Sequence, residues 1–179
     1  RRPAQMLSVR PDLEIVMIRG NVDTRLAKLA AGDCDAMLLA AAGLNRMGLS
    51  QHIRSYIDAD IHASAPGQGA LAVQCRTADL GADWMRKLHH EPTFLAVQAE
   101  RGALKALEAS CRTAVGAYAK IDGDILSLFV EALSADGKIR WQRRETLINP
   151  DALSARNLGL RLGIEITVEA GPDLIQIGG

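Results

Sequence analysis

Short apolar runs alternate with a stretch of helical spacing over the first 75 residues. Residues 13–18, 36–40 and 70–75 are apolar on both faces, which favours buried parallel strands over half-exposed ones. Between the first two runs, leucines recur at helical spacing behind Asp23, so a capped helix is expected there. The pattern predicts a strand–helix–strand unit over residues 13–40, with the right-handed crossover that parallel strands prefer.

The second half of the chain shows one long helical stripe and then segments typical of antiparallel strands. A helix is expected from Glu91 to about Ala109, because Pro92 suits a helix start and apolar residues then recur at helical spacing. Glycine-containing turns separate the segments that follow, which predicts a three-stranded meander. The expected strands are residues 115–121, 125–133 and 138–146. The remaining expected helices are residues 2–9 and 150–162, and the state of residues 164–168 is left open.

Composition limits the function classes without selecting one. Hydrophobic residues make up 48% of the 179 residues and charged residues 23%, as in ordinary globular proteins. The 21 basic and 21 acidic residues balance, so no overall field attracts nucleic acid or an anionic membrane, and aromatic residues at 3% are too few for base stacking. The longest apolar run, residues 36–44, is shorter than the roughly 20 residues that span a bilayer. With no signal segment at the start, we expect a cytoplasmic protein that binds neither nucleic acid nor membrane.

Three arginines stand next to the ends of the expected strands and helices. Arg19 follows one apolar run, Arg25 opens the next helix, and Arg46 follows another run. In an open α/β sheet all three face the crevice at the carboxyl ends of the strands. Guanidinium groups offer paired donors that match carboxylates, so recognition of a polycarboxylate is one interpretation. Ordinary surface ion pairs are the other, and the sequence leaves both open.

The cysteines and histidines give weaker signals. Cys34, Cys75 and Cys111 lie far apart without a CxxC pair, which argues against a disulfide framework and a cysteine-rich zinc site. Cys111 lies at a helix–strand junction beside a cationic neighbour that favours the thiolate, although an inert buried cysteine is the more common case for such a position. His89 and His90 are adjacent and lack a third ligand at metal-binding spacing, so no metal site is expected.

Several segments taken together resemble the porphobilinogen deaminase (hydroxymethylbilane synthase) family along nearly the whole chain. The family's RGNVxTRLxKL segment is similar to residues 19–29, and its DAxxLAxAGLxRxG segment is similar to residues 35–48. The remaining matches are the arginine pair at the start of the chain, the PxxGQGA turn at residues 66–70, the HHE and AER segments at 89–91 and 99–101, and the cofactor loop at 107–116.

The resemblance implies a fold of mixed α/β and α+β type. Residues 1–63 would form an α/β domain like those of periplasmic binding proteins, corresponding to the second domain of the family and truncated at its start. Residues 64–88 would form a crossover with a strand that returns to the missing first domain. Residues 89–179 would form a small α+β domain that carries the cofactor and contains the three-stranded antiparallel sheet and helices.

The resemblance also implies a covalent cofactor and its ligands. A dipyrromethane would be held by a thioether to Cys111, and arginines would bind the acetate and propionate groups of cofactor, porphobilinogen and growing polypyrrole chain. The cofactor-binding residues implied are Cys111, Arg1, Arg2, Arg19, Arg25, Gly43 and Gln68, and the substrate-binding residues are Arg19, Arg25 and Arg46. The cofactor loop departs from the family, with Ala109-Ser110 in place of two glycines and Thr113-Ala114 in place of a proline.

The implied activity is a transferase reaction of heme and tetrapyrrole biosynthesis. Family enzymes deaminate and polymerise four porphobilinogen units on the dipyrromethane primer and release hydroxymethylbilane by hydrolysis, so Cys111 would be an anchor. The family's catalytic aspartate lies in the N-terminal domain and has no counterpart here, so we expect no catalytic residue in this chain and no activity from it alone. The full-length protein is expected to be a monomer.

Two other functions remain open from the sequence. The arginines suit a non-enzymatic anion-binding module of the same α/β architecture equally well. Alternatively, the chain has a structural or regulatory role in which residues 70–75 pair with another chain, because an apolar strand without a partner leaves an open edge.

Overall fold

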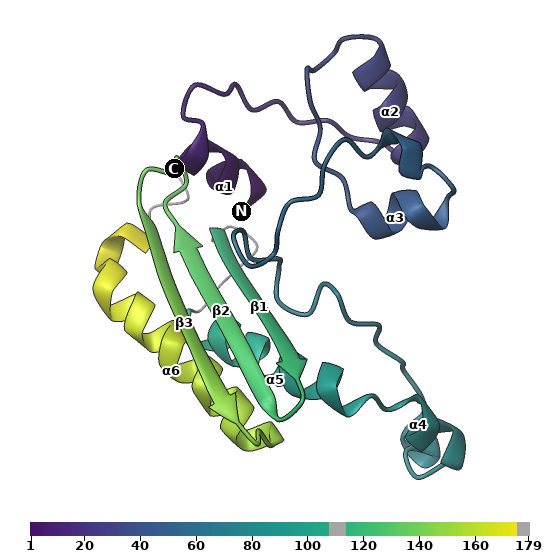
Figure 1. Cartoon of the computed structure of the whole chain (residues 1–179), viewed down its shortest axis with the longest axis vertical. Coiled ribbons are helices and arrows are strands. Elements are labelled where there is room, and N and C mark those ends of the chain that lie inside the picture. Colours follow the sequence, from purple (N-terminus) through teal and green to yellow (C-terminus); the bar gives the residue numbers. More distant parts are fainter. Residues whose placement is uncertain (108–113, 175–179) are drawn as a thin grey trace. The chain divides into compact units, whose positions relative to one another are not determined.

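The computed structural model describes residues 1–107 and 114–174, which form two compact units (Figure 1). The first unit contains residues 1–12 together with the chain from residue 59 onward, and the second contains residues 13–58. The second unit is therefore an insertion between the first helix and the rest of the first unit.

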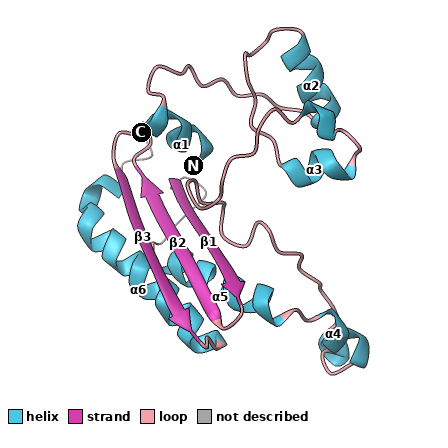
Figure 2. Ribbon diagram, in the orientation of Figure 1, coloured by secondary structure: helices cyan, strands magenta, loops and turns pink. Residues whose placement is uncertain are grey.

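The first unit is built on a three-stranded antiparallel sheet, which confirms the predicted meander (Figure 2). Its strands are β1 (Ala114–Asp122), β2 (Ile125–Leu133) and β3 (Arg140–Ile148), and β2 lies in the centre. In the register, Phe129 of β2 pairs with Tyr118 of β1 and Arg144 of β3. Short turns join the strands, as expected for hairpins.

One face of the sheet packs against two long helices, α5 (Glu91–Ala106) and α6 (Ala152–Ala170), which lie on the same side in Figure 1. Alternate residues of the strands point to this side because side chains in a strand alternate between faces. They form the main core with the inner faces of the helices, and its largest fully buried members include Leu126, Leu128, Val130, Leu162 and Ile166. Since aromatic residues are few, aliphatic side chains supply most of this core.

The two helices approach each other closely through glycines. A Cβ atom on Gly159 would overlap the carbonyl oxygen of Ala99, and one on Gly163 would lie 2.6 Å from the Cβ of Ala106. Helix α6 begins with a capping box between Asp151 and Ser154. It continues without a break to Ala170, so the β-branched residues 164–168 are helical.

The opposite face of the sheet is partly covered by the short helix α1 (Arg2–Val9) and by the chain that enters from the second unit. Ala4 of α1 packs with Ala114 and Leu133 in a small buried cluster. The amide of Ala117 donates to the carbonyl of Ser64 at 3.0 Å, so residues 63–64 run along the free edge of β1. This edge is thereby protected in part.

The second unit contains two helices, α2 (Val22–Ala30) and α3 (Ala41–Arg46), and the 3-10 turn η1 (Ser50–His52). The N-cap of α2 is Asn21, whose side chain accepts from the amide of Thr24 at 2.8 Å, so the predicted cap at Asp23 was wrong by two residues. Short helical elements elsewhere are η2 (Thr77–Asp79), α4 (Asp83–Leu88) and η3 (Gly171–Leu174).

Three predicted strands are not present: residues 13–18, 36–40 and 70–75 are neither helix nor strand. A strand forms only where a second strand accepts and donates its backbone hydrogen bonds, and no such partner lies within the described residues. Apolar side chains on these segments are correspondingly exposed, with Met17 at 79% and Leu71 at 89%. These segments are apolar, but apolar side chains alone do not form a strand without a partner, so the three strand predictions were wrong for the described structure.

Glu100 connects helix α5 to both the crossover and the sheet. Its carboxylate is buried and accepts from the amide of Gly67 at 2.6 Å and from that of Ala119 at 2.9 Å. Burial raises the pKa of Glu100, and the two backbone hydrogen bonds oppose this shift without cancelling it. The turn at residues 66–69 is therefore held on the sheet by a carboxylate for which ionisation is costly.

Gly159→Ala is expected to destabilise the first unit. Alanine has the higher helix propensity by about 1 kcal/mol, but the new methyl group would overlap the backbone of α5 and force the helices apart. We expect a net loss of about 2 kcal/mol in the free energy of unfolding, measured by urea denaturation. Gly81→Ala is the control, since a Cβ there meets no atom within 4 Å. Equal stability of the two variants would contradict the close helix contact.

The raised pKa of Glu100 predicts how stability depends on pH. A carboxyl group whose pKa is higher in the folded than in the unfolded chain stabilises the fold below its ordinary value of 4.5, and this contribution is lost as pH rises through the folded pKa. Wild type should therefore lose stability relative to Glu100→Gln as pH rises above about 4.5. Denaturation of both proteins at several pH values tests this. A difference in the free energy of unfolding that stays constant, or that moves in favour of wild type as pH rises, would show that the pKa is not raised.

Candidate functional site

Arg1 and Gln68, two of the predicted site residues, lie together in the first unit. The guanidinium of Arg1 donates through Nη1 to the carbonyl of Ala63 at 2.7 Å and to Oε1 of Gln5 at 3.3 Å. Its Nη2 lies 3.5 Å from Oε1 of Gln68. The pKa of Arg1 is lowered, first by partial burial and next by the charge of Arg2, while Glu131 acts in the opposite direction. The neighbouring Arg2 is exposed on the first turn of α1.

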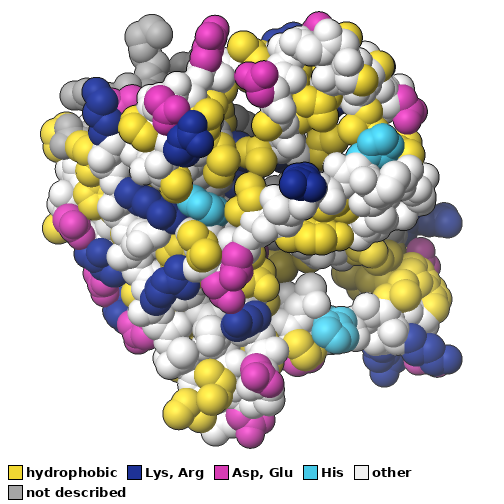
Figure 3. Space-filling view, turned by 45° about the horizontal axis from the view of Figure 1, so that its top comes forward, with side chains coloured by type: hydrophobic (Ala, Val, Ile, Leu, Met, Phe, Trp, Pro, Cys, Tyr) yellow, Lys and Arg dark blue, Asp and Glu magenta, His cyan; other side chains and the backbone are white. Residues whose placement is uncertain are grey.

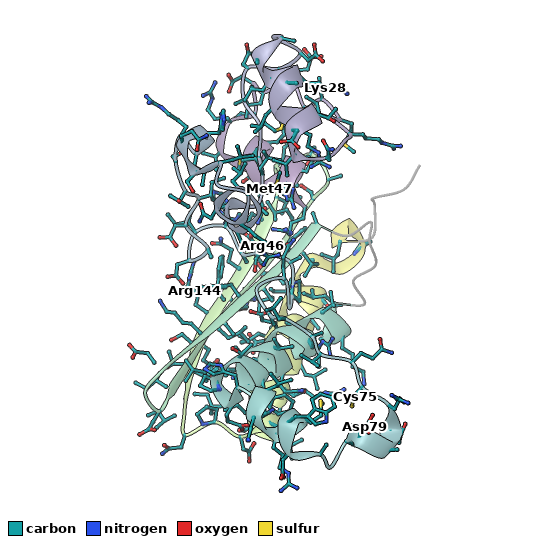
Figure 4. The ribbon with its side chains drawn as sticks, turned by 90° about the vertical axis from the view of Figure 1, so that its right-hand side faces the viewer. Lys28, Arg46, Met47, Cys75, Asp79 and Arg144 are labelled. Carbon is teal, nitrogen blue, oxygen red and sulfur yellow. The ribbon has the colours of Figure 1, made fainter. Side chains whose placement is uncertain are left out.

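Three other predicted arginines lie in the second unit: Arg19 precedes α2, Arg25 lies within α2, and Arg46 ends α3. Arg25 in α2 donates through Nε to the carbonyl of Gly20 at 2.8 Å, which fixes the loop that carries Arg19. Arg19 is exposed, as is Arg46 at the end of α3, labelled in Figure 4. The side chains of Arg19 and Arg46 make no hydrogen bond or ion pair with any described residue. Gly43 lies within α3, and a Cβ there would meet no atom within 4 Å.

The predicted site residues thus form two groups, one in each unit. The first unit holds Arg1, Arg2 and Gln68, and the second holds Arg19, Arg25, Arg46 and Gly43. Both groups present arginine nitrogens that described carboxylates leave unoccupied, which is the donor chemistry that carboxylate ligands require. Cys111 lies outside the described residues, in the sequence between α5 and β1.

The sequence analysis missed a buried polar network beside Arg1. Glu131 of β2 is fully buried and accepts hydrogen bonds from Gln5, from the amide of Ala63 and from Arg140. One signal could have drawn attention to it, because Glu131 is the only charged residue in the strand sequence ILSLFVEAL. Its partners could not be found this way, since Gln5 and Ala63 lie 126 and 68 residues away in the chain.

Two hollows are present on the first unit, and none of the five predicted arginines lines either of them. The larger, of 540 Å³, lies on the open face of the sheet, where Arg144 stacks over Phe129 at 3.6 Å and Lys120 pairs with Asp60 at 3.1 Å. The smaller, of 310 Å³, lies between α5, the end of β1 and the crossover, with Glu100 in its wall. The face shown in Figure 3 carries basic and acidic side chains interspersed, in agreement with the balanced charge.

The two adjacent histidines have structural roles. His89 pairs with Glu91 at 2.6 Å, and His90 caps α5 through Thr93. Within residues 1–107 and 114–174, no group of three or more His, Cys, Asp or Glu side chains is placed to hold a metal ion. No helix in the same ranges has both the length and the apolar character needed to cross a membrane.

Two models of one protein family match the chain. The model described as "Porphobilinogen deaminase, dipyromethane cofactor binding domain" matches residues 1–83, and the model described as "Porphobilinogen deaminase, C-terminal domain" matches residues 94–167. The chain is 56% identical to the porphobilinogen deaminase of Caulobacter sp. (strain K31) over 178 residues. These residues make up 98% of this chain and 56% of that protein. Identity to the porphobilinogen deaminase of Phenylobacterium zucineum (strain HLK1) is 52%, over 98% of this chain and 56% of the relative.

A more distant relative gives the same result. The porphobilinogen deaminase of Thermobifida fusca (strain YX) is 44% identical over 98% of this chain and 57% of its own length. The chain therefore spans a little over half the length of the curated relatives it matches. Because both family models and all these relatives agree, the chain belongs to the porphobilinogen deaminase family, and its residues 1–83 belong to that family's dipyrromethane cofactor-binding domain.

Proposed function

We propose that this chain is the carboxylate-binding and cofactor-carrying portion of a hydroxymethylbilane synthase. The complete protein would join four porphobilinogen units on a dipyrromethane primer and release hydroxymethylbilane by hydrolysis, within heme and tetrapyrrole biosynthesis. The observation that carries this proposal is the set of uncommitted arginine nitrogens within the domain that the family uses to bind dipyrromethane. The family match disfavours a non-enzymatic anion-binding module.

The donor set fits the chemistry of the proposed cofactor. Each pyrrole unit carries an acetate and a propionate group, so a dipyrromethane presents four carboxylates to the protein. Arg19 and Arg46 have no described partner, and Arg25 uses only Nε on the carbonyl of Gly20, leaving both Nη groups for a ligand. Guanidinium forks match carboxylates with two parallel hydrogen bonds. The residues present can therefore hold such a group.

Cys111 is the proposed attachment point. When bound, the dipyrromethane supplies the primer on which pyrrole units are added, and a thioether to Cys111 keeps it attached throughout. Such an anchor has to form once only, so the protein needs no base beside Cys111 for turnover. The aspartate that the resemblance assigns to catalysis belongs to a part of the family protein that this chain does not match, so the proposed role here is binding and anchoring.

The finer architecture is also a proposal. Residues 1–63 would form an α/β domain of the periplasmic-binding-protein type, residues 64–88 a crossover, and residues 89–179 the cofactor-carrying domain. The exposed apolar side chains on residues 13–18 and 70–75 support this, because pairing in a sheet would bury them. A cytoplasmic location is part of the same proposal. We also propose that the complete protein is monomeric.

Covalent attachment is expected to be visible in the intact mass of the purified chain. A thioether survives denaturation, so the wild-type mass should exceed that of the polypeptide by one dipyrromethane, and Cys111→Ser should abolish the increase. Cys75→Ser is the matched control and should retain it, since Cys75 is a free cysteine elsewhere in the same unit. An adduct that persists in Cys111→Ser, or one that Cys75→Ser also loses, would contradict the proposed anchor.

Replacing a site arginine by lysine is expected to weaken porphobilinogen binding while keeping the charge. Lysine lacks the paired donors of guanidinium, and one lost charge-assisted hydrogen bond corresponds to roughly a fivefold to tenfold lower affinity. Arg19→Lys and Arg46→Lys should each show this in calorimetric titration. Arg54→Lys, an exposed arginine of the same unit outside the predicted set, should bind like wild type. Equal affinities for all three variants would argue against carboxylate recognition by these arginines.

A further inference from the structure

Glu131 is a buried carboxylate that the proposed binding and anchoring roles do not use. Both of its oxygens are saturated: Oε1 accepts from Nε2 of Gln5 at 2.5 Å and from the amide of Ala63 at 2.9 Å. Oε2 accepts from Nε and Nη2 of Arg140 at 2.9 Å and 2.6 Å. The donors come from α1, from Ala63 just before the crossover and from β3, so one side chain joins three separate segments.

The hydrogen bonds of Gln5 fix the direction of this network. The two hydrogens on Nε2 are used by Glu131 and by the carbonyl of Ala63 at 2.9 Å, which leaves Oε1 as an acceptor. Oε1 points to Nη1 of Arg1 at 3.3 Å. Because Gln5 is itself 97% buried and both ends of its amide are engaged, it cannot rotate without losing these bonds.

Arg1 is held at the end of this chain of hydrogen bonds. The carbonyl of Ala63 accepts from both Gln5 and Arg1. Nη1 of Arg1 is therefore held by two acceptors, this carbonyl and Oε1 of Gln5. A guanidinium has five N–H donors, and Nη1 uses both of its own while Nη2 directs one to Gln68. One hydrogen on Nε and one on Nη2 remain without a described acceptor. These neighbouring nitrogens have the spacing of the two oxygens of a carboxylate.

Stability alone is a weak reason for Glu131. A buried ion pair seldom stabilises a fold more than apolar residues of similar size, because both charges lose their hydration. Leu133, the next residue on the same face of β2, lies in an apolar cluster with Ala4 and Ala114. An apolar side chain at position 131 would extend that cluster. It would leave Gln5 without the acceptor that fixes its amide.

We propose that Glu131 is a positioning residue for Arg1. It acts through Gln5 and Ala63 to hold the guanidinium beside Gln68, with the Nε and Nη2 donors directed to a carboxylate of the pyrrole ligand. This inference rests on the proposed function, since it specifies how the first unit supplies one of the carboxylate-binding groups. It assigns to the C-terminal sheet a role in the geometry of a site residue 130 positions earlier in the chain.

A double-mutant cycle on porphobilinogen binding tests the inference. In titrations of the 179-residue chain, Glu131→Gln should lower the affinity about fivefold, because its amide places a donor against Gln5 and Ala63 or against Arg140. Arg1→Ala should lower the affinity at least as much. If Glu131 acts through Arg1, adding Glu131→Gln to Arg1→Ala causes no further loss. A merely structural role gives either no effect or the same loss in both backgrounds, and either result overturns the proposal.

A milder variant and a matched control keep the test decisive. Gln5→Met preserves the size of the side chain and leaves Glu131 three of its four donors. It interrupts the hydrogen bonds between Glu131 and Arg1 and remains usable even where Glu131→Gln does not fold. It should show the same non-additivity with Arg1→Ala. Glu145→Gln removes a carboxylate of β3 that pairs with Arg161 on the surface and should leave affinity unchanged.

Failure of wild type to bind porphobilinogen overturns the proposed function and this inference together. Wild-type binding with additive losses overturns the inference alone.

Discussion

Two buried carboxylates hold residues 63–67 on the sheet, and the arrangement of the first unit depends on them. Glu131 binds the amide of Ala63 from β2, and Glu100 binds the amide of Gly67 from α5. Residues 63–67 follow the second unit in sequence and pass the edge of β1. They belong to no strand, so most of their backbone groups have no partner in a sheet. Backbone groups that are buried outside a sheet require such side-chain acceptors. The carboxylates of Glu131 and Glu100 therefore accept the hydrogen bonds that a neighbouring strand would otherwise accept.

The helix pair makes the second of these contacts possible. Glu100 lies in the middle of α5, and it reaches both the crossover and Ala119 of β1 because α5 lies directly on the sheet. Helix α6 supports α5 from the side, and Gly102 and Gly159 allow the two backbones to meet. Larger residues there would move α5, and with it the carboxylate of Glu100. Small residues in one interface thus determine the geometry of a polar contact in another.

The sequence predicted the elements whose hydrogen bonds are local. The helices depend on bonds four residues apart, and the hairpins on turns of a few residues, so period and turn residues were enough to locate most of them within a few positions. Helix α6 nevertheless runs eight residues beyond its expected end, and α4 was not predicted. Residues 13–18 and 70–75 were expected as strands, but their state depends on a partner strand, which periodicity cannot supply. The same limit applies to Glu131, whose partners Gln5 and Ala63 are distant in the chain. The arginines of the site were recognised from family motifs and from their places at the ends of elements, not from any contact.

Arg1 differs from Arg19 and Arg46 in how its side chain is held, and this difference bears on which ligand each suits. Arg1 is fixed by Ala63 and Gln5, so little side-chain freedom is lost when it binds a ligand. Arg19 and Arg46 are exposed and uncommitted, and their side chains adjust to carboxylates at more than one position at the cost of their own rotamer freedom. For the proposed activity, a cofactor that stays attached suits the fixed Arg1, and a chain that gains two carboxylates with each added pyrrole suits the exposed Arg19 and Arg46. Under this proposal the fixed arginine belongs to the unit whose sequence also contains Cys111, the proposed attachment point of the cofactor.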